Sequence, residues 1–465
     1  MNLKSDIFLN KEIRELKVTV MGLGLNGGGF ASAEFFASRG ADVTVTDLRN
    51  REILKATIDK LSGYNIRYVL EKHVREDFTG ADIVIKNPAV PADSPWLSDA
   101  KRIETDISIF LTLSSNPVIA VTGSKGKSTT VSALYHVIKE IHPGAKLGGN
   151  ITTSPLSFID SLEADKRSPV VLELSSWQLA DLAGKNVLKP AVSVITNILP
   201  DHLNRYRGME EYAADKKLIY HDQDKKDYTL CFYDDEWGKK FAAETPAKAL
   251  FFSAERLPEG MEGAWLEKNG EGFIRLAGKK ERLIGENILM QGRHNRLNLL
   301  ASGAAAYLYG IEAQVIEKQL ASFRGIPHRM EYICTKKGIT FYNDTTATIP
   351  EAVIAAAISF TSPVRLISGG TDKKLDFSVL DRLAGKTEMI YLLEGSATDK
   401  MIPFLDKYNI AWCGPFNSLS DAAEKAFSQS REGDTVIMSP GCTSFGMFKN
   451  EFDRGDTFKK IVDSF

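Results

Sequence analysis

Residues 117–140 constrain the fold most, because they read as strand, glycine loop and helix in immediate succession. Their sequence is PVIAVTGSKGKSTTVSALYHVIKE. Gly126, Lys127 and Ser128 match the end of the phosphate-loop pattern G-x-x-x-x-G-K-[ST], but the first glycine of that pattern is replaced by valine and Gly123 follows instead. A basic turn is the alternative interpretation. The flanking strand and helix favour a shortened phosphate loop, in which Lys127 reaches the β- and γ-phosphates and the Ser128 hydroxyl reaches Mg²⁺.

A second glycine loop lies near the N-terminus. GLGLNG, residues 22–27, satisfies G-x-G-x-x-G, follows the apolar strand 16–21 and opens a helical pattern that ends at Gly40. Asp47 closes the next strand, at about the distance expected of an acid that binds a ribose hydroxyl. Such glycines let the backbone approach a phosphate at a helix N-terminus. The motif favours a nucleotide diphosphate; NAD or NADP, and a tight turn of purely structural use, are the alternatives.

Strand-like and helix-like runs alternate along the chain, which predicts an α/β protein with parallel sheets and βαβ crossovers. The length of 465 residues suits about three domains. Residues 255–285 read as hairpins, and the Gly- and Pro-containing run 324–331 reads as a linker before four strands, ITFYND, VRLISGG, EMIYLLEG and DTVIMSP. We therefore predict a Rossmann-like N-terminal domain over 1–112, a central P-loop domain with a mostly parallel sheet over 113–325, and a Rossmann-like C-terminal domain over 326–465.

The composition argues against several classes of protein. A net charge of -2 gives no bulk attraction to nucleic acid or to an anionic membrane. The N-terminus has no secretory pattern, and no run approaches the ~20 apolar residues of a membrane helix. The four cysteines form no C-x-x-C pair, which argues against a disulfide framework or a zinc site. We expect a cytoplasmic protein that neither binds nucleic acid nor inserts into a membrane.

Two polar side chains follow predicted strands of the central domain. Glu173 lies in the buried-strand pattern VVLELSS, where a carboxylate is costly unless it is paired or binds a metal. It is therefore a candidate Mg²⁺ ligand facing the phosphate loop, with a helix-capping role as the alternative. His202 follows ITNILPD at the end of another strand, a usual place for site residues, although a structural histidine is the alternative. No function is assigned to His73, His136, His142 and His221.

A series of short runs follows an order that is typical of one enzyme family. The runs are TGSKGKSTT, GGN, LELSSWQL, TNILPDHLNRY, GRHNRLN, GIPHRME, YNDTTAT and SPGCTSFGMFKN. Together they resemble the Mur ligases over essentially the whole chain. The N-terminal GLGLNG is similar to the branch of that family that adds D-glutamate to UDP-N-acetylmuramoyl-L-alanine. By this resemblance, the shortened loop is the ATP loop of a Mur ligase.

The resemblance implies an ATP-dependent amide ligase of peptidoglycan precursor synthesis. In that reaction ATP phosphorylates the substrate carboxylate, and the glutamate amine displaces phosphate from the acyl phosphate. The catalytic residues would be Lys127, Glu173, His202 and Lys216. The resemblance further implies two Mg²⁺ ions, held by Ser128, Glu173, His202 and a carbamate on Lys216, whose bare ammonium would repel the ion. We expect a monomer.

The resemblance also assigns the residues that bind substrates. On the ATP side they are Gly123, Ser124, Lys125, Gly126, Lys127, Ser128, Thr129, Asn295, Asn298, Arg329 and Asp344. On the UDP-sugar side they are Leu25, Asn26, Asp47, Arg49 and Asn150. For glutamate they are Thr348, Lys373 and Ser444.

Two positions in the third domain depart from the family pattern. Thr346, in NDTTAT, replaces a lysine near the phosphates. Glu451 takes the place of an aromatic residue beside the glutamate pocket, and Phe452 follows it, so that a shift of one residue would restore the ring. These departures leave L-glutamate as an alternative substrate.

Rival classes explain less of the sequence. A folylpolyglutamate synthase-like ligase shares the short loop, but it has no uridine-binding first domain to account for GLGLNG. An NAD-dependent dehydrogenase leaves the second phosphate loop unexplained. A non-catalytic P-loop scaffold predicts loss of Lys127, Glu173 or His202, and all three are present.

Overall fold

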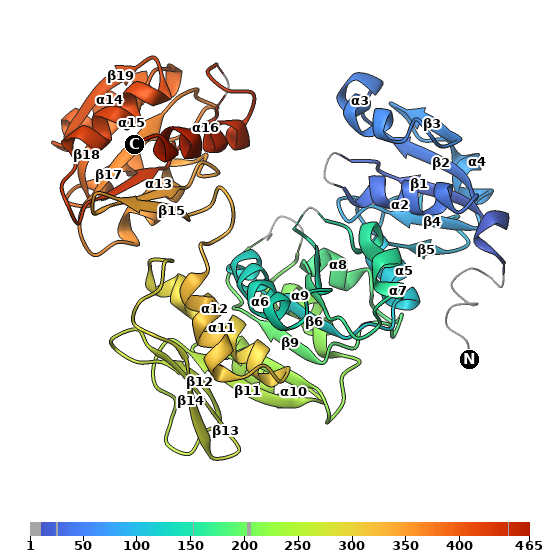
Figure 1. The fold of residues 1–465 in the computed structure, drawn as a ribbon. Coiled ribbons are helices and arrows are strands. Elements are labelled where there is room, and N and C mark those ends of the chain that lie inside the picture. The colour runs from blue at the N-terminus through green and yellow to red at the C-terminus, as the bar shows by residue number, and fades with distance from the viewer. Residues whose placement is uncertain (1–10, 25–26, 152, 202–205, 445) are drawn as a thin grey trace. The chain divides into compact units, whose positions relative to one another are not determined.

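The computed structural model describes residues 1–465 except 1–10, 25–26, 152, 202–205 and 445. Its chain forms two compact units. The first unit comprises Met1–Ile284 and Asn298–Leu320, and the second comprises Gly285–Leu297 and Ala321–Phe465. Three sheets of mainly parallel strands, with helices between the strands, confirm the predicted three-domain α/β class (Figure 1). The exact boundaries at 112 and 325 stay predictions.

The first sheet of unit one has the strand order β3-β2-β1-β4-β5, and its strands are parallel. The chain winds from β1 to one side and then returns to add β4 on the other, so a switch point lies between β1 and β4, where ligands of such sheets bind. The strands are β1 (Lys17–Met21), β2 (Asp42–Asp47), β3 (Ile66–Leu70), β4 (Ile83–Lys86) and β5 (Ile103–Glu104). The helices are η1 (Ile13–Glu15), α2 (Gly28–Ser38), α3 (Arg51–Lys60), α4 (Arg75–Thr79) and α5 (Asp106–Leu113).

The second sheet of unit one has the order β14-β13-β12-β11-β10-β9-β6-β8-β7. The pairs from β7 to β12 are parallel, while β12, β13 and β14 pair antiparallel, which confirms the predicted hairpins. The strands are β6 (Val118–Thr122), β7 (Lys146–Gly149), β8 (Val170–Glu173), β9 (Val192–Ile195), β10 (Tyr228–Phe232), β11 (Lys248–Ser253), β12 (Gly263–Leu266), β13 (Gly272–Leu276) and β14 (Lys279–Ile284). The helices between β6 and β15 are α6 (Lys127–Ile141), η2 (Pro155–Phe158), α7 (Ile159–Glu163), α8 (Ser176–Ala180), α9 (Met209–Lys217), η3 (Leu218–Tyr220), α10 (Glu236–Glu244), α11 (Arg293–Leu308) and α12 (Ala313–Ser322).

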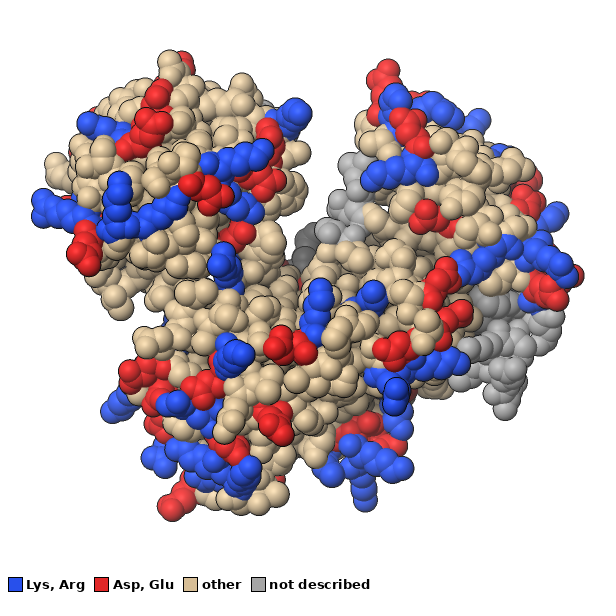
Figure 2. Space-filling model, in the orientation of Figure 1, with Lys and Arg blue, Asp and Glu red and all other residues tan. Residues whose placement is uncertain are grey.

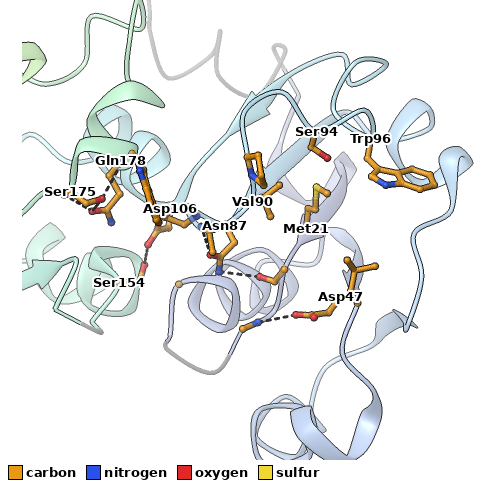
Figure 3. Close-up of a pocket in the computed structure, with 18 of the residues that line it drawn as sticks. Met21, Asp47, Asn87, Val90, Ser94, Trp96, Asp106, Ser154, Ser175 and Gln178 are labelled. Carbon is orange, nitrogen blue, oxygen red and sulfur yellow. Dashed lines mark hydrogen bonds between the residues drawn. The ribbon is translucent and has the colours of Figure 1, made fainter. Parts of the chain in front are cut away.

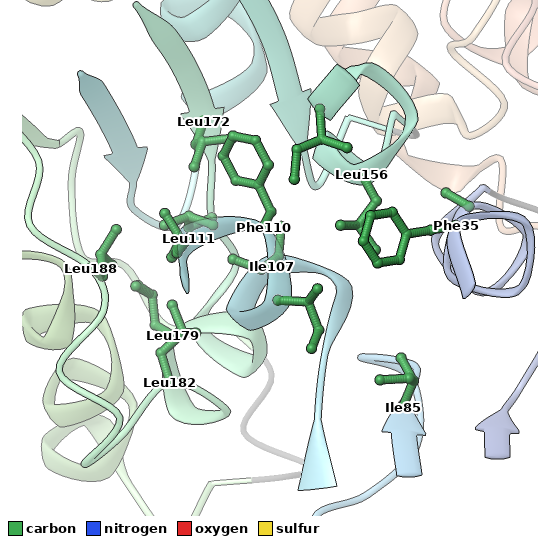
Figure 4. Packing of buried hydrophobic residues seen from close by; sticks show 14 of the residues in the cluster. Phe35, Ile85, Ile107, Phe110, Leu111, Leu156, Leu172, Leu179, Leu182 and Leu188 are labelled. Atoms are coloured by element: carbon green, nitrogen blue, oxygen red, sulfur yellow. The ribbon is translucent and has the colours of Figure 1, made fainter. Parts of the chain in front are cut away.

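One hydrophobic core joins these two sheets. Helix α5 contributes Ile107, Phe110 and Leu111, which pack in one cluster with Leu156 and Leu172 of the second sheet's layer (Figure 4). The same cluster contains residues of β1, β2 and α2. The layers of both sheets thus contribute side chains to the same hydrophobic cluster.

The sheet of unit two has the order β15-β16-β20-β17-β18-β19, and only β15 and β16 pair antiparallel among its described pairs. The sequence predicted four of these strands and missed β15, which lies at the edge of the sheet, and β19, which contains a Gly-Pro pair that is typical of turns. The strands are β15 (Glu331–Lys336), β16 (Ile339–Asn343), β17 (Val364–Gly369), β18 (Thr387–Leu393), β19 (Trp412–Phe416) and β20 (Thr435–Met438). The helices are α13 (Pro350–Ile358), η4 (Ser378–Leu383), α14 (Ser396–Lys407), α15 (Leu419–Gln429) and α16 (Glu451–Asp463).

The charged side chains are mixed rather than sorted by sign. Figure 2 shows Lys and Arg interspersed with Asp and Glu on the face in view, in keeping with the net charge of -2. None of the helices in the described part of the chain has the length and apolar character needed to cross a bilayer.

Candidate active site

The shortened phosphate loop joins β6 to α6, as the sequence predicts. Gly123 and Gly126 have φ angles of 139° and 87°, which residues other than glycine rarely adopt. A Cβ on Gly123 would overlap Thr196 Oγ1 and lie 3.0 Å from the Thr196 nitrogen, and a Cβ on Gly126 would overlap the Asn298 amide. The loop can therefore turn tightly against its neighbours only because both residues are glycine. Helix α6 starts at Lys127, so its free N–H groups point into the loop, the arrangement that favours phosphate.

Two lysines converge on the backbone of this loop. Lys127 Nζ donates to the carbonyl oxygens of Gly123 and Ser124 at 2.9 and 3.0 Å. Lys216, near the end of α9, donates to the same Gly123 oxygen at 2.9 Å. Burial lowers the pKa of Lys127, against the opposing charge of Glu173. Burial and the charge of Lys127 lower the pKa of Lys216 to about 7, so much of its amine is neutral near neutral pH.

Glu173 ends β8 beside the same loop, with 1% of its surface exposed. Its Oε1 accepts from Asn150 Nδ2 at 2.9 Å, and its Oε2 is buried with no hydrogen-bond partner among the described residues. An unpaired carboxylate oxygen in a buried site is costly unless a cation or donor compensates it. The charge of Glu173 partly opposes the lowering of the pKa values of Lys127 and Lys216.

Some of the side chains around the phosphate loop, Glu173 and Ser128, suit Mg²⁺, whereas Lys216 in its positive form does not. The free Oε2 of Glu173 is the hard oxygen ligand that Mg²⁺ prefers, and the Ser128 hydroxyl stands in the first turn of α6. The positive form of Lys216 does not fit a cation, whereas a carbamate would supply oxygens. Within the described part of the chain no three His, Cys, Asp or Glu side chains form a metal cluster. His202 lies outside the described residues.

A cavity of about 860 Å³ lies in unit one, at the carboxyl ends of β1, β2 and β4 (Figure 3). Asp47 and Arg49 line one part of it, and Asn150 lines another. Asp47 accepts from the backbone N–H of Gly24 at 3.2 Å through Oδ2 and from that of Arg49 at 2.9 Å through Oδ1. The structure thus brings together three of the five residues predicted for the UDP-sugar, and their binding role stays a prediction. Leu25 and Asn26 lie outside the described residues.

Sequence reasoning missed several residues of this cavity. His73 received no function, yet it lines the cavity, with its Nδ1 2.7 Å from Thr46 Oγ1 and its ring 5.4 Å from that of Trp96. Burial lowers the pKa of His73. The proline-rich run after β4 was the available signal for Trp96, because such a run marks a loop at the switch-point edge. The other missed lining residues include Asn87, Asp106, Ser154, Ser175 and Gln178.

In unit two the predicted glutamate residues lie on neighbouring loops. Lys373 Nζ donates to Thr348 Oγ1 at 3.3 Å. The backbones of Thr371 and Thr443 pair through hydrogen bonds of 3.2 and 3.1 Å, which sets the loop of Lys373 beside that of Ser444. The Ser444 side chain is buried. Their contact with glutamate stays a prediction.

Asp344, a predicted ATP contact, links two segments of unit two through its carboxyl group. Its Oδ2 accepts from Ser439 at 2.8 Å and its Oδ1 accepts from the Met330 backbone at 3.1 Å, next to the predicted ATP contact Arg329. Burial raises the pKa of Asp344 to about 7, against the charge of Arg329. Asn295, also predicted for ATP, donates to the Gln291 carbonyl at 2.7 Å.

The two departures from the family pattern have defined surroundings. The Thr346 hydroxyl donates to the His328 carbonyl at 2.8 Å. Glu451 opens α16, and its carbonyl accepts from Thr345 at 2.9 Å. The ring of Phe452 is half exposed and lies 5.4 Å from that of His328. Phe452 therefore presents an aromatic surface in unit two.

A phosphate loop on one sheet and a glycine-loop cavity beside it define a nucleotide-dependent α/β enzyme of the P-loop class. Comparison with known families specifies the class further. The family model described as "Mur ligase middle domain" matches residues 121–306, and that described as "Mur ligase MurD-like, N-terminal domain" matches residues 16–109. The chain belongs to the Mur ligase family.

Similar proteins cover nearly the whole chain. It is 42% identical to the UDP-N-acetylmuramoylalanine–D-glutamate ligase of Borreliella afzelii, over 97% of this chain and 98% of that protein. It is 38% identical to the ligase of the same name from Treponema pallidum, over 96% and 97%. Among solved structures, its fold is similar to that of MurF from Acinetobacter baumannii, with a TM-score of 0.59 and 16% identity over 97% of this chain and 94% of that one. MurC from Thermotoga maritima gives a TM-score of 0.58 at 20% identity, over 97% and 100%.

Proposed function

We propose that this protein is an ATP-dependent ligase that joins D-glutamate to UDP-N-acetylmuramoyl-L-alanine in peptidoglycan precursor synthesis. The observation that carries the proposal is the full-length similarity to ligases named for D-glutamate addition. The site agrees with it, because Lys127, Lys216 and Glu173 surround a phosphate loop within the same unit as a nucleotide-sized cavity. The cytoplasm, where ATP and UDP-sugars are available, is the proposed location.

In this proposal ATP binds to the phosphate loop between β6 and α6. The N–H groups at the start of α6 and the Lys127 ammonium neutralise its phosphates, so that the γ-phosphate becomes open to attack by the substrate carboxylate. Positioning and charge neutralisation supply most of the catalysis in such phosphoryl transfer. The carboxylate takes the phosphoryl group and ADP leaves, which gives an acyl phosphate.

Glu173, Ser128, His202 and Lys216 would hold Mg²⁺, with Lys216 as a carbamate and two ions in all. When bound, Mg²⁺ supplies neutralisation of phosphate charge. The lowered pKa of Lys216 supports the carbamate, because only a neutral amine adds to CO₂. Addition of the neutral amine to CO₂ releases a proton and would leave a negative carbamate, whose charge, together with that of Glu173, a cation would balance.

The glutamate amine then attacks the acyl phosphate, and phosphate leaves from the tetrahedral intermediate. Lys373 and Ser444 would hold the two carboxylates of glutamate, and Thr348 accepts a hydrogen bond that orients Lys373. The relatives' names favour D-glutamate over the L-glutamate alternative and over a folylpolyglutamate synthase-like reaction.

Phosphate release tests the proposal. The purified protein is given ATP, Mg²⁺ and UDP-N-acetylmuramoyl-L-alanine, with D-glutamate, L-glutamate or neither. Release that requires D-glutamate supports the proposal. Release with L-glutamate alone would assign the other stereochemistry, and release with neither amino acid, or none at all, would refute the glutamate ligase.

A further inference from the structure

Arg329, a predicted ATP contact, is the last residue of a tight turn in unit two. Its N–H donates to the Ile326 carbonyl at 3.1 Å, with Pro327 second and His328 third in the turn. His328 has a φ of 67°, the positive value that a type II turn needs at its third position and that glycine usually supplies. Met330, on the other side of Arg329, has a φ of 44°. Arg329 therefore lies between two residues in strained conformations, which persist only where surrounding contacts hold them.

Thr346 holds the peptide group that precedes Arg329. Its Oγ1 donates to the His328 carbonyl oxygen at 2.8 Å, and its backbone N–H donates to the same oxygen at 3.1 Å. Because a peptide group is planar, fixing this carbonyl also fixes the direction in which the chain enters Arg329. The hydroxyl of Thr346 thus helps to keep the peptide group in its place against the strain at His328.

Asp344 holds the peptide group that follows Arg329. Its Oδ1 accepts from the Met330 N–H at 3.1 Å, and its Oδ2 accepts from Ser439 Oγ at 2.8 Å. Asp344 and Thr346 both belong to the segment directly after β16. One short segment therefore contacts the peptide groups on both sides of Arg329.

Residue 346 is also one of the two departures from the family pattern, which has a lysine near the phosphates at this position. A threonine has no charge with which to neutralise a phosphate. Its hydroxyl has a single hydrogen, and in Thr346 that hydrogen is donated to the His328 carbonyl. The hydroxyl of Thr346 therefore acts on the turn and has no hydrogen left to donate to a phosphate oxygen.

We propose that Thr346 is a positioning residue that acts on ATP through Arg329. Its hydroxyl fixes the strained turn, and the turn directs the guanidinium of Arg329 toward its ligand. This inference rests on the proposed ATP-dependent ligase, in which Arg329 contacts ATP. It gives the threonine a role toward the nucleotide rather than toward glutamate.

Steady-state kinetics of the full-length protein test the inference, with the KM for ATP and the KM for D-glutamate measured separately. Thr346→Val keeps the shape and the backbone N–H bond but removes the hydroxyl, whereas Thr346→Ser keeps the hydroxyl. Thr457→Val is the matched control, because Thr457 Oγ1 also donates to a backbone carbonyl of unit two, that of Asp453, at 2.8 Å. Thermal unfolding reports whether each variant is folded.

Thr346→Val is expected to raise the KM for ATP about three- to tenfold, the effect of losing one hydrogen bond, with the KM for D-glutamate little changed. Thr346→Ser and Thr457→Val should keep the KM for ATP within about twofold of the parent value. The inference is overturned if the Val variant has a normal KM for ATP, or if Ser is as weak as Val. An equal rise in the KM for D-glutamate, or an equal effect of Thr457→Val, would also overturn it.

A second pair of variants tests whether Thr346 acts through Arg329. Arg329→Ala is expected to raise the KM for ATP at least as far as Thr346→Val does, and adding Thr346→Val to it should change that KM less than about twofold. A normal KM for ATP in Arg329→Ala, or a further rise in the double variant as large as that in the parent, would contradict the inference. A parent protein without ligase activity would remove the proposed function itself, whereas an active parent with a normal Thr346→Val variant would remove only this inference.

Discussion

Lys127 and Lys216 donate hydrogen bonds to one and the same acceptor, the carbonyl oxygen of Gly123, each at 2.9 Å. Two ammonium groups that share an acceptor repel each other, and the buried partner yields first by losing its proton. Burial first, and then the charge of Lys127, lower the pKa of Lys216 to about 7. The position of Lys216 in contact with the phosphate loop thus favours the neutral form of its amine.

A neutral amine at Lys216 is the form that could add CO₂, so the proposed carbamate can be tested directly. Protein equilibrated with ¹³C-labelled CO₂ is expected to give a carbamate signal in ¹³C NMR that is absent in Lys216→Arg, whose guanidinium does not form one. Lys217→Arg is the matched control, because Lys217 is exposed and pairs with Glu244. Loss of the signal in the Lys217 variant, but not in the Lys216 variant, would show that the neighbouring lysine is modified instead.

The same lysine makes stability depend on pH. Its pKa is about 7 in the folded chain and 10.5 when unperturbed, so between these values the unfolded chain binds more protons. The free energy of unfolding therefore receives a contribution that rises with pH across this window and is lost as the pH falls toward 7. Urea titrations between pH 7 and 9.5 in CO₂-free buffer should show a shallower rise for Lys216→Met than for the parent. Parallel curves would contradict the lowered pKa.

The phosphate loop depends on glycine at position 123. In Gly123→Ala, the alanine would be strained at the positive φ of this position, and its Cβ would collide with Thr196. The substitution should therefore lower the free energy of unfolding by about 3–5 kcal/mol, and it should weaken ATP binding. Gly184→Ala is the control: its φ is 72°, but nothing lies within 4 Å of the added Cβ, so it should cost about 1–2 kcal/mol. Urea unfolding measures both, and equal costs would show that strain alone matters.

Glu173 is expected to act through its unpaired oxygen. Glu173→Gln keeps the shape and an acceptor for Asn150 but removes the charge, so kcat should fall about 100-fold or more while thermal stability changes little. The concentration of Mg²⁺ for half-maximal activity should rise in parallel. An unchanged Mg²⁺ dependence would exclude Glu173 as a metal ligand.

Lys373 should act on glutamate rather than on ATP. Lys373→Ala removes a charged donor and should raise the KM for D-glutamate about tenfold or more, with the KM for ATP little changed. Lys374→Ala, the exposed neighbour with a φ of 67°, is the control for charge and backbone. Steady-state kinetics that show equal effects for both lysines would assign the loss to general charge.

The sequence by itself determined the features that depend on neighbouring residues, namely the phosphate loop and the succession of strands and helices. The phosphate loop and the start of α6 follow from glycines that accept positive φ and from an apolar strand before them. Alternating strands and helices likewise predicted the α/β class. In unit two, β15 and β19 were missed, because both are edge strands that exist through pairing with one neighbour, β15 with β16 and β19 with β18.

Only the tertiary structure determined the burial and the charged surroundings of the site side chains. The sequence presents Lys216 as an exposed helix lysine, and its depressed pKa arises because α9 packs against the loop of β6. Asp106 and His73 carry no local signal, since what distinguishes them is burial at a cavity built from β1, β2, β4 and the central sheet's loops. Burial and charge proximity depend on contacts between residues far apart in the chain, and for that reason residue types and spacing alone could not reveal them.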